Sequence, residues 1–96
     1  MPSDVDDAFY ERADAHIHLA NDQLKGISAG KVSASMMYAA SRFNAWRSAT
    51  GFDTAEEMKD AKDKTVAYFV AEYEKCLTEN LDDYIENFDK YLKSSH

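Results

Sequence analysis

Residues 31–46 read KVSASMMYAASRFNAW, and this stretch decides the fold. Its apolar residues recur at spacings of three and four, which is the period of an α-helix, and neither proline nor glycine interrupts it. One face carries the apolar side chains, several of them large, and the opposite face carries small ones. The apolar face consists of Val32, Met36, Ala39, Ala40, Phe43 and Trp46. The stretch therefore predicts a helix over residues 32–49 that can be contacted on two sides.

The helical period continues on both sides of this stretch. No segment alternates with a period of two for long enough to be a strand, so we expect an all-α fold and a single domain over residues 1–96. Gly26, Gly30 and Gly51 mark the joints, and Gly26 suits the left-handed residue that follows a helix. The expected architecture is a small three- to four-helix bundle with helices at about 4–25, 32–49, 54–79 and 80–93.

Short signals place the ends of these helices. Ser3 is the expected cap of the first helix, and Thr54 with Glu57 has the spacing of a capping box. The apolar stripe changes direction near Asn80, which predicts a bend or break there with Asn80 as the cap of the last helix. The alternative is one long bent helix over residues 54–93.

The charge distribution narrows the classes of partner. Eighteen acidic and eleven basic residues give a net charge of −7, which repels nucleic acid and anionic membrane surfaces. Residues 31–50 carry no acid and three bases, Lys31, Arg42 and Arg47, so a local basic patch is the one feature that favours nucleic acid. No stretch reaches the roughly 20 apolar residues of a membrane span, and the acidic N-terminus lacks the pattern of a secretory signal. We therefore expect a cytoplasmic protein without nucleic-acid or membrane partners.

Residues 13–22, ADAHIHLAND, hold the most metal-like pattern in the chain. Residues i and i+2 of a helix point about 200° apart, so His16 and His18 cannot share an ion, and His16 is expected to be partly buried. The candidate metal ligands on the face of His18 are Glu11, Asp14, His18 and Asp22. They give the alternative function of a small metal-binding or metal-sensing protein, although a solvated charged face is the commoner meaning of such a pattern.

No motif in the sequence defines a reaction. Cys76 lies among acidic residues that disfavour a thiolate, and it has no second cysteine for a disulfide. The GISAG segment, residues 26–30, lacks both the following Lys-Ser/Thr pair and the preceding strand of a phosphate-binding loop. We therefore expect no catalytic residue and no cofactor, and the sequence favours a protein without enzymatic activity.

Aromatic residues are frequent near the C-terminus. Tyrosine has an apolar body and a polar tip, which suits it to protein interfaces. A short chain can leave part of such a stripe uncovered within one copy. We therefore expect a protein-interaction module that self-associates as a homodimer through its aromatic C-terminal helices, with Tyr84, Phe88 and Tyr91 as the interaction residues.

Three blocks of the sequence carry a resemblance to a known family. They are FYERADAHIHLANDQL (9–24), KVSASMMYAASRFNAW (31–46) and NLDDYIENFDKYL (80–92). They resemble a family of small, acidic bacterial proteins known only as a domain of unknown function, and the likeness runs from about Phe9 to Leu92. The resemblance implies a helical, cytosolic protein with no assigned activity, substrate or cofactor, and it carries over no functional residue. The sequence departs from the family pattern at DAHIHLAND (14–22), where fewer histidines are expected.

Overall fold

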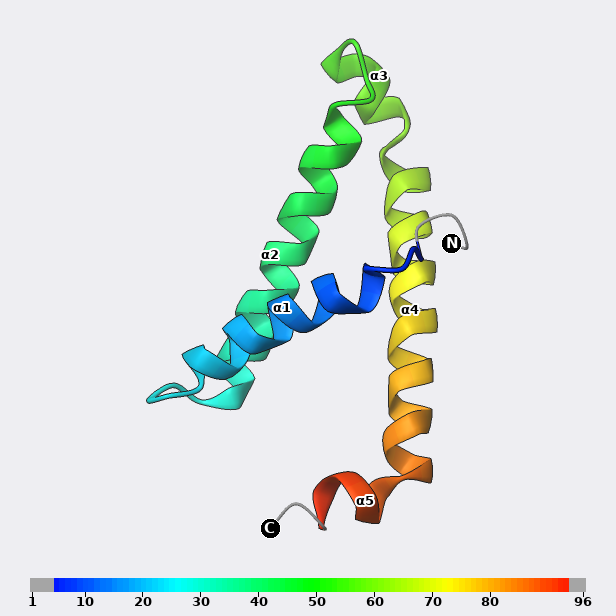
Figure 1. The fold of residues 1–96 in the computed structure, drawn as a ribbon. Helices are drawn as coiled ribbons and strands as arrows, with labels where there is room; N and C mark the ends of the chain where they lie inside the picture. The colour runs from blue at the N-terminus through cyan, green and yellow to red at the C-terminus, as the bar shows by residue number, and fades with distance from the viewer. Residues whose placement is uncertain (1–4, 94–96) are drawn as a thin grey trace. The chain divides into compact units, whose positions relative to one another are not determined.

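The computed structural model describes residues 5–93, and all of its regular secondary structure in this range is helical (Figure 1). The chain is therefore a small all-α protein, as the sequence predicts. In chain order the helices are α1 (Phe9–Gln23), α2 (Ala29–Ala49), α3 (Ala55–Asp60), α4 (Lys62–Glu86) and α5 (Phe88–Leu92).

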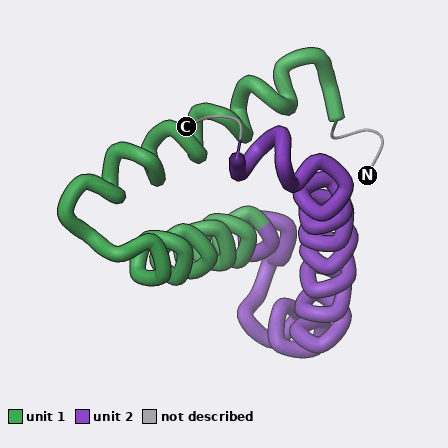
Figure 2. The backbone as a smooth tube through the Cα atoms, turned by 90° about the horizontal axis from the view of Figure 1, so that it is seen from below, with its two compact units in different colours: residues 1–47 green, residues 48–96 purple. Residues whose placement is uncertain are grey.

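The chain divides into two compact units, residues 1–47 and residues 48–96 (Figure 2). The first unit contains α1 and most of α2. The second contains the end of α2 and the whole of α3, α4 and α5, and there α4 contacts both of its short neighbours in the sequence. The expectation of a single domain over residues 1–96 stays a prediction.

Helix α1 begins later than the sequence predicts. Its first residue is Phe9 rather than residue 4 or 5, and Ala8 occupies the cap position without a side-chain hydrogen bond. Asp6 lies before the helix, where its carboxylate accepts a 2.8 Å hydrogen bond from Arg12. Ser3, the predicted cap, lies outside the described residues. The acidic side chain in the first turn of α1 is Glu11.

The connection between α1 and α2 is shorter than expected. Gly26 has a φ of 95°, which confirms the left-handed residue predicted after the first helix. Helix α2 then begins at Ala29, three residues before the predicted start, and the Ser28 hydroxyl oxygen accepts a 3.4 Å hydrogen bond from the backbone N–H of Lys31. The helix ends at Ala49, as predicted.

The second unit confirms one predicted boundary and corrects another. Thr54 caps α3, because its hydroxyl oxygen accepts a hydrogen bond from the backbone N–H of Glu57 at 3.1 Å. The break predicted near Asn80 is wrong: α4 runs through it without interruption, and the Asn80 side chain donates to the Cys76 carbonyl one turn earlier. The breaks lie instead at Ala61, between α3 and α4, and at Asn87, between α4 and α5. The alternative of one long bent helix is therefore closer to the structure than the division at residue 80.

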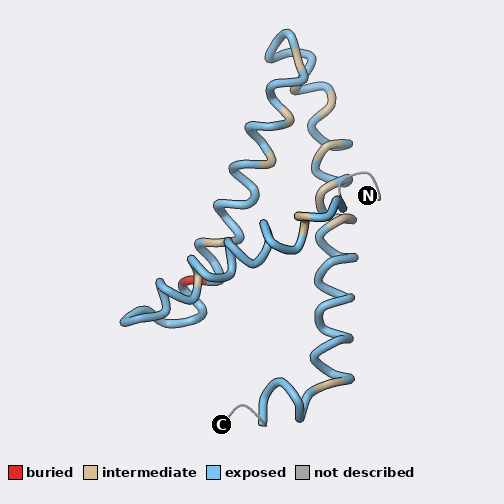
Figure 3. Tube along the Cα trace, in the orientation of Figure 1, coloured by how far each residue is buried: buried red, intermediate tan, exposed pale blue. Residues whose placement is uncertain are grey.

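Very little of the described chain is buried. Within residues 5–93, Val32 on α2 is the one buried hydrophobic residue, with 6% of its surface exposed (Figure 3). The apolar residues that form helical stripes in the sequence remain largely exposed on α1, α2 and α4. Most of the large apolar side chains of residues 5–93 are thus exposed.

Candidate interaction surface

Helix α4 carries a continuous row of exposed apolar side chains, which we call the α4 stripe. Consecutive members are three or four residues apart, so at about 100° per residue they share one face of the helix. Each member is between 43% and 60% exposed. The stripe consists of Val66, Val70, Tyr73, Leu77, Leu81 and Tyr84.

The stripe ends at a hydrogen-bonded corner between α4 and α5, which we call the Asp83 corner. One carboxylate oxygen of Asp83 accepts a 2.9 Å hydrogen bond from the Asn87 side-chain amide. The other accepts a 3.1 Å hydrogen bond from the Tyr91 hydroxyl. The Asn87 amide also donates to the backbone carbonyl of Asp83 at 3.1 Å. These bonds tie the short α5 to the last turns of α4.

Charge in the Asp83 corner affects the titration of Tyr91. The hydrogen bond that its hydroxyl donates to Asp83, followed by the negative charge of that carboxylate, raises the pKa of Tyr91 above its usual value. The ammonium of Lys90 lies 5.8 Å from the centre of the Tyr91 ring, within the range of a cation–π contact. Tyr91 is therefore held by local polar interactions as well as by apolar contact.

The three predicted interaction residues are all exposed on α4 and α5. The rings of Tyr84 and Tyr91 are in contact, with centroids 4.9 Å apart. Phe88, the first residue of α5, is 51% exposed. The structure thus brings Tyr84 and Tyr91 together across the bend and leaves Phe88 open to solvent. The sequence reasoning missed Asp83, although the spacing of four residues to Asn87 and eight to Tyr91 places all three on one side of a helix.

The candidate metal ligands are not assembled into a site. Glu11, Asp14, His18 and Asp22 are exposed on α1, and no group of three or more His, Cys, Asp or Glu residues in the described range is arranged to hold a metal ion. Asp22 lies 3.9 Å from the ammonium of Lys25. His16 is also exposed, so the prediction of its partial burial was wrong. No observation among residues 5–93 favours the metal-binding alternative.

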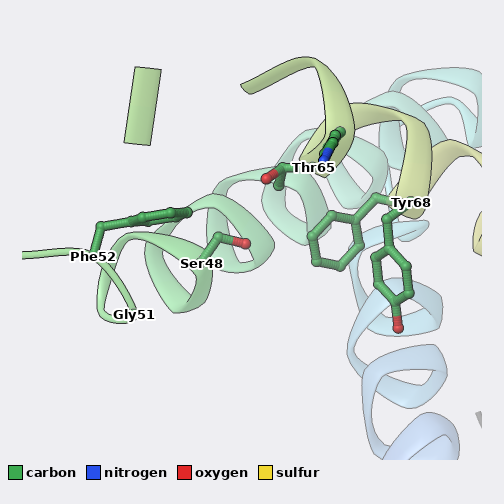
Figure 4. Close-up of a pocket in the computed structure, with 7 residues that line it drawn as sticks. Ser48, Gly51, Phe52, Thr65 and Tyr68 are labelled. Atoms are coloured by element: carbon green, nitrogen blue, oxygen red, sulfur yellow. The ribbon is translucent and has the colours of Figure 1, made fainter. Parts of the chain in front are cut away.

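A shallow, largely apolar hollow lies in the second unit where the end of α2 approaches the start of α4. Its volume is about 380 Å³. Figure 4 shows the hydroxyl groups of Ser48 and Thr65 between the Phe52 ring and the aromatic rings of α4. Thr65 donates its hydroxyl hydrogen to the Ala61 carbonyl at 3.0 Å, so this hydroxyl is already engaged. This hollow could not be predicted from local spacing, because its walls come from residues up to 21 positions apart, Ser48 to Phe69.

The helical content and the exposed stripe describe a small all-α protein with a row of exposed apolar side chains on α4. The chain belongs to the family described as Protein of unknown function (DUF3144), whose model matches residues 9–85. This finding confirms the resemblance seen in the sequence.

One solved structure shares the fold at substantial sequence identity. It is the NMR structure of the protein NB7890A from Shewanella sp., which is 44% identical to this chain with a TM-score of 0.77. The match covers 92% of this chain and 94% of that protein. No curated protein matches the sequence. Among the helices of residues 5–93, none has the length and apolar character needed to cross a membrane.

Proposed function

We propose that this protein is a non-enzymatic interaction module that self-associates through the exposed apolar residues of α4 and α5. The observation that carries the proposal is the α4 stripe, whose six members share one helix face and remain about half exposed. Contiguous exposed apolar surface of this kind is a common feature of protein interaction sites.

The types of residue in this region support a protein partner. Complete burial of a large apolar side chain contributes about 1.5–3 kcal/mol. Because the side chains of the α4 stripe are about half exposed, covering each of them with a partner would contribute roughly half of that free energy. Tyr73, Tyr84 and Tyr91 can bury their rings and keep their hydroxyl groups at a wet rim. Phe88, beyond the bend, is a further exposed aromatic residue.

The net charge of −7 favours a protein over a polyanion as the partner. The second unit contributes most of this charge, since residues 51–96 hold twelve acids and six bases. A phosphate backbone would be repelled from α4 and α5, whereas another protein can meet their apolar surface.

Sedimentation equilibrium of the whole chain at micromolar concentrations tests the proposal. We expect a dimer, and we expect the double variant Tyr84→Ala, Phe88→Ala to weaken it. The variant removes four aromatic side chains from the dimer, two from each copy, which costs at least about 2 kcal/mol, roughly thirtyfold in Kd. Tyr38→Ala is the matched control, because Tyr38 is a 69% exposed aromatic on α2 and is not a member of the stripe. A monomer at all concentrations would refute the proposal, as would equal weakening by Tyr38→Ala.

A further inference from the structure

The spacing of the α4 stripe is nearly symmetrical about its own midpoint. Val66 and Tyr84 lie nine residues before and nine after Lys75, and Tyr73 and Leu77 lie two before and two after it. The remaining pair, Val70 and Leu81, lies five before and six after. Read in the reverse direction, the stripe therefore places apolar side chains at almost the same positions.

A row with this symmetry fits a second copy of itself that runs in the opposite direction. In a twofold-symmetric contact, residue i of one copy meets residue j of the other, and residue j meets residue i. With the axis at Lys75, Val66 lies opposite Tyr84 and Tyr73 lies opposite Leu77. Each of these pairs places an aliphatic side chain against an aromatic one, so a ring does not have to pack against an identical ring.

The charges along α4 favour the same direction. The first part of the helix, residues 62–71, holds two lysines and one aspartate, a net charge of +1. The remaining part, residues 72–86, holds six acids and one lysine, a net charge of −5. Parallel copies would place two −5 segments side by side. The two segments would then repel each other, because charges within about 10 Å are only partly screened by salt. Antiparallel copies with the axis at Lys75 place residues 79–86, with a net charge of −4, opposite residues 64–71, with a net charge of +1.

From the symmetry of the stripe and the asymmetry of the charge, we infer that the partner of α4 is the α4 helix of a second copy of this chain, bound antiparallel with the twofold axis near Lys75. This inference rests on the proposed self-association and specifies its geometry. The stripe of each copy covers the stripe of the other. The face that carries Lys64, Lys75 and Glu86 points about 180° away from the stripe and stays in solvent.

Distances between spin labels on two copies test this geometry. The native Cys76 is free and exposed, so it is first replaced by Cys76→Ser. Single cysteines are then introduced by Lys64→Cys, Lys75→Cys or Glu86→Cys on the face opposite the stripe, and each variant is labelled and measured by pulsed electron paramagnetic resonance. Sedimentation of each labelled variant shows whether it keeps the association state of the parent chain.

We expect the shortest distance at Lys75 and longer distances at both ends. Lys64 and Glu86 each lie eleven residues from the axis, so in an antiparallel pair their labels are separated along the helix by about 33 Å more than those at Lys75. A dimer with similar distances at all three positions, or with its minimum at one end, would overturn the antiparallel geometry and leave self-association intact. A monomer without intermolecular distances would overturn both.

Discussion

The hydroxyl of Tyr91 donates a 3.1 Å hydrogen bond to Oδ2 of Asp83, eight residues earlier in the chain. Asn87, midway between them, donates to the other oxygen of the same carboxylate at 2.9 Å. One acidic side chain therefore anchors the residue at the bend and the residue beyond it. This carboxylate therefore contributes to the direction of α5 relative to α4, together with the contact between the Tyr84 and Tyr91 rings.

Raising the pH should release this anchor. The pKa of Tyr91 is raised in the folded chain, so its stabilising contribution is fully present below the unfolded value of about 10 and is lost as the pH rises through the folded value. Above that pH the phenolate has no proton to donate and is repelled by Asp83. The free energy of unfolding of the native chain should therefore exceed that of Tyr91→Phe near neutral pH, and the difference should disappear in strong base.

Ultraviolet titration of the tyrosines checks the cause of this effect. Asp83→Asn keeps an oxygen that can accept the hydrogen bond but removes the charge, so we expect Tyr91 to ionise at lower pH in this variant. An unchanged titration curve in Asp83→Asn would show that the carboxylate does not act on Tyr91.

Removing the cap of α3 should destabilise the second unit. Thr54→Ala leaves the backbone N–H of Glu57 without its acceptor, and the loss of such a cap costs about 1 kcal/mol of unfolding free energy. Thr54→Ser is the control, since serine retains the hydroxyl oxygen. Chemical denaturation measures the change, and amide exchange at Glu57 shows whether it is local. Equal stability of Thr54→Ala and the native chain would contradict the role of the cap.

Two glycines should respond in opposite ways to replacement by alanine. Gly26 has a φ of 95°, where a side chain is strained, so Gly26→Ala should cost about 1 kcal/mol. Gly30 lies in α2 with open space around its missing Cβ, so Gly30→Ala should stabilise the helix by about 0.5 kcal/mol. Thermal unfolding of both variants provides the comparison. A change of the same sign at both positions would show that backbone conformation does not decide the effect.

Much of the helical structure could be predicted from local sequence, because helix period and capping are local properties. The apolar spacing around Met36 and Phe43 predicted α2 to within three residues, and Thr54 predicted the start of α3. The start of α1 was misplaced because acidic residues suited to a first turn occur before the helix, where Asp6 binds Arg12 instead.

The position of the last bend could not be predicted from residue type. Asn80 and Asn87 both donate to the carbonyl four residues earlier, yet α4 continues through the first and ends at the second. Unlike Asn80, Asn87 also donates a hydrogen bond to the side-chain carboxylate of Asp83. The hydroxyl of Tyr91, on α5, donates to the same carboxylate. These hydrogen bonds form only when α4 and α5 are folded against each other, so the helix propensities of the residues cannot predict them.

The candidate site was predicted in part. Composition and spacing, which are visible in a single sequence, pointed to Tyr84, Phe88 and Tyr91, which are exposed, and their role in an interaction stays a prediction. The spacing of Glu11 and His18 on one helix is equally visible, but a metal site requires ligands that converge in space.

Among residues 5–93, Val32 is the one buried hydrophobic residue, so a single copy of the chain has little core to stabilise it. If the remaining apolar surface is covered by a second copy, then mass action links folding to abundance, because a partner that binds the folded state alone stabilises it. Dilution would then dissociate the subunits and destabilise their tertiary structure at the same time. The level of synthesis would set the fraction of chains that withstands proteolysis.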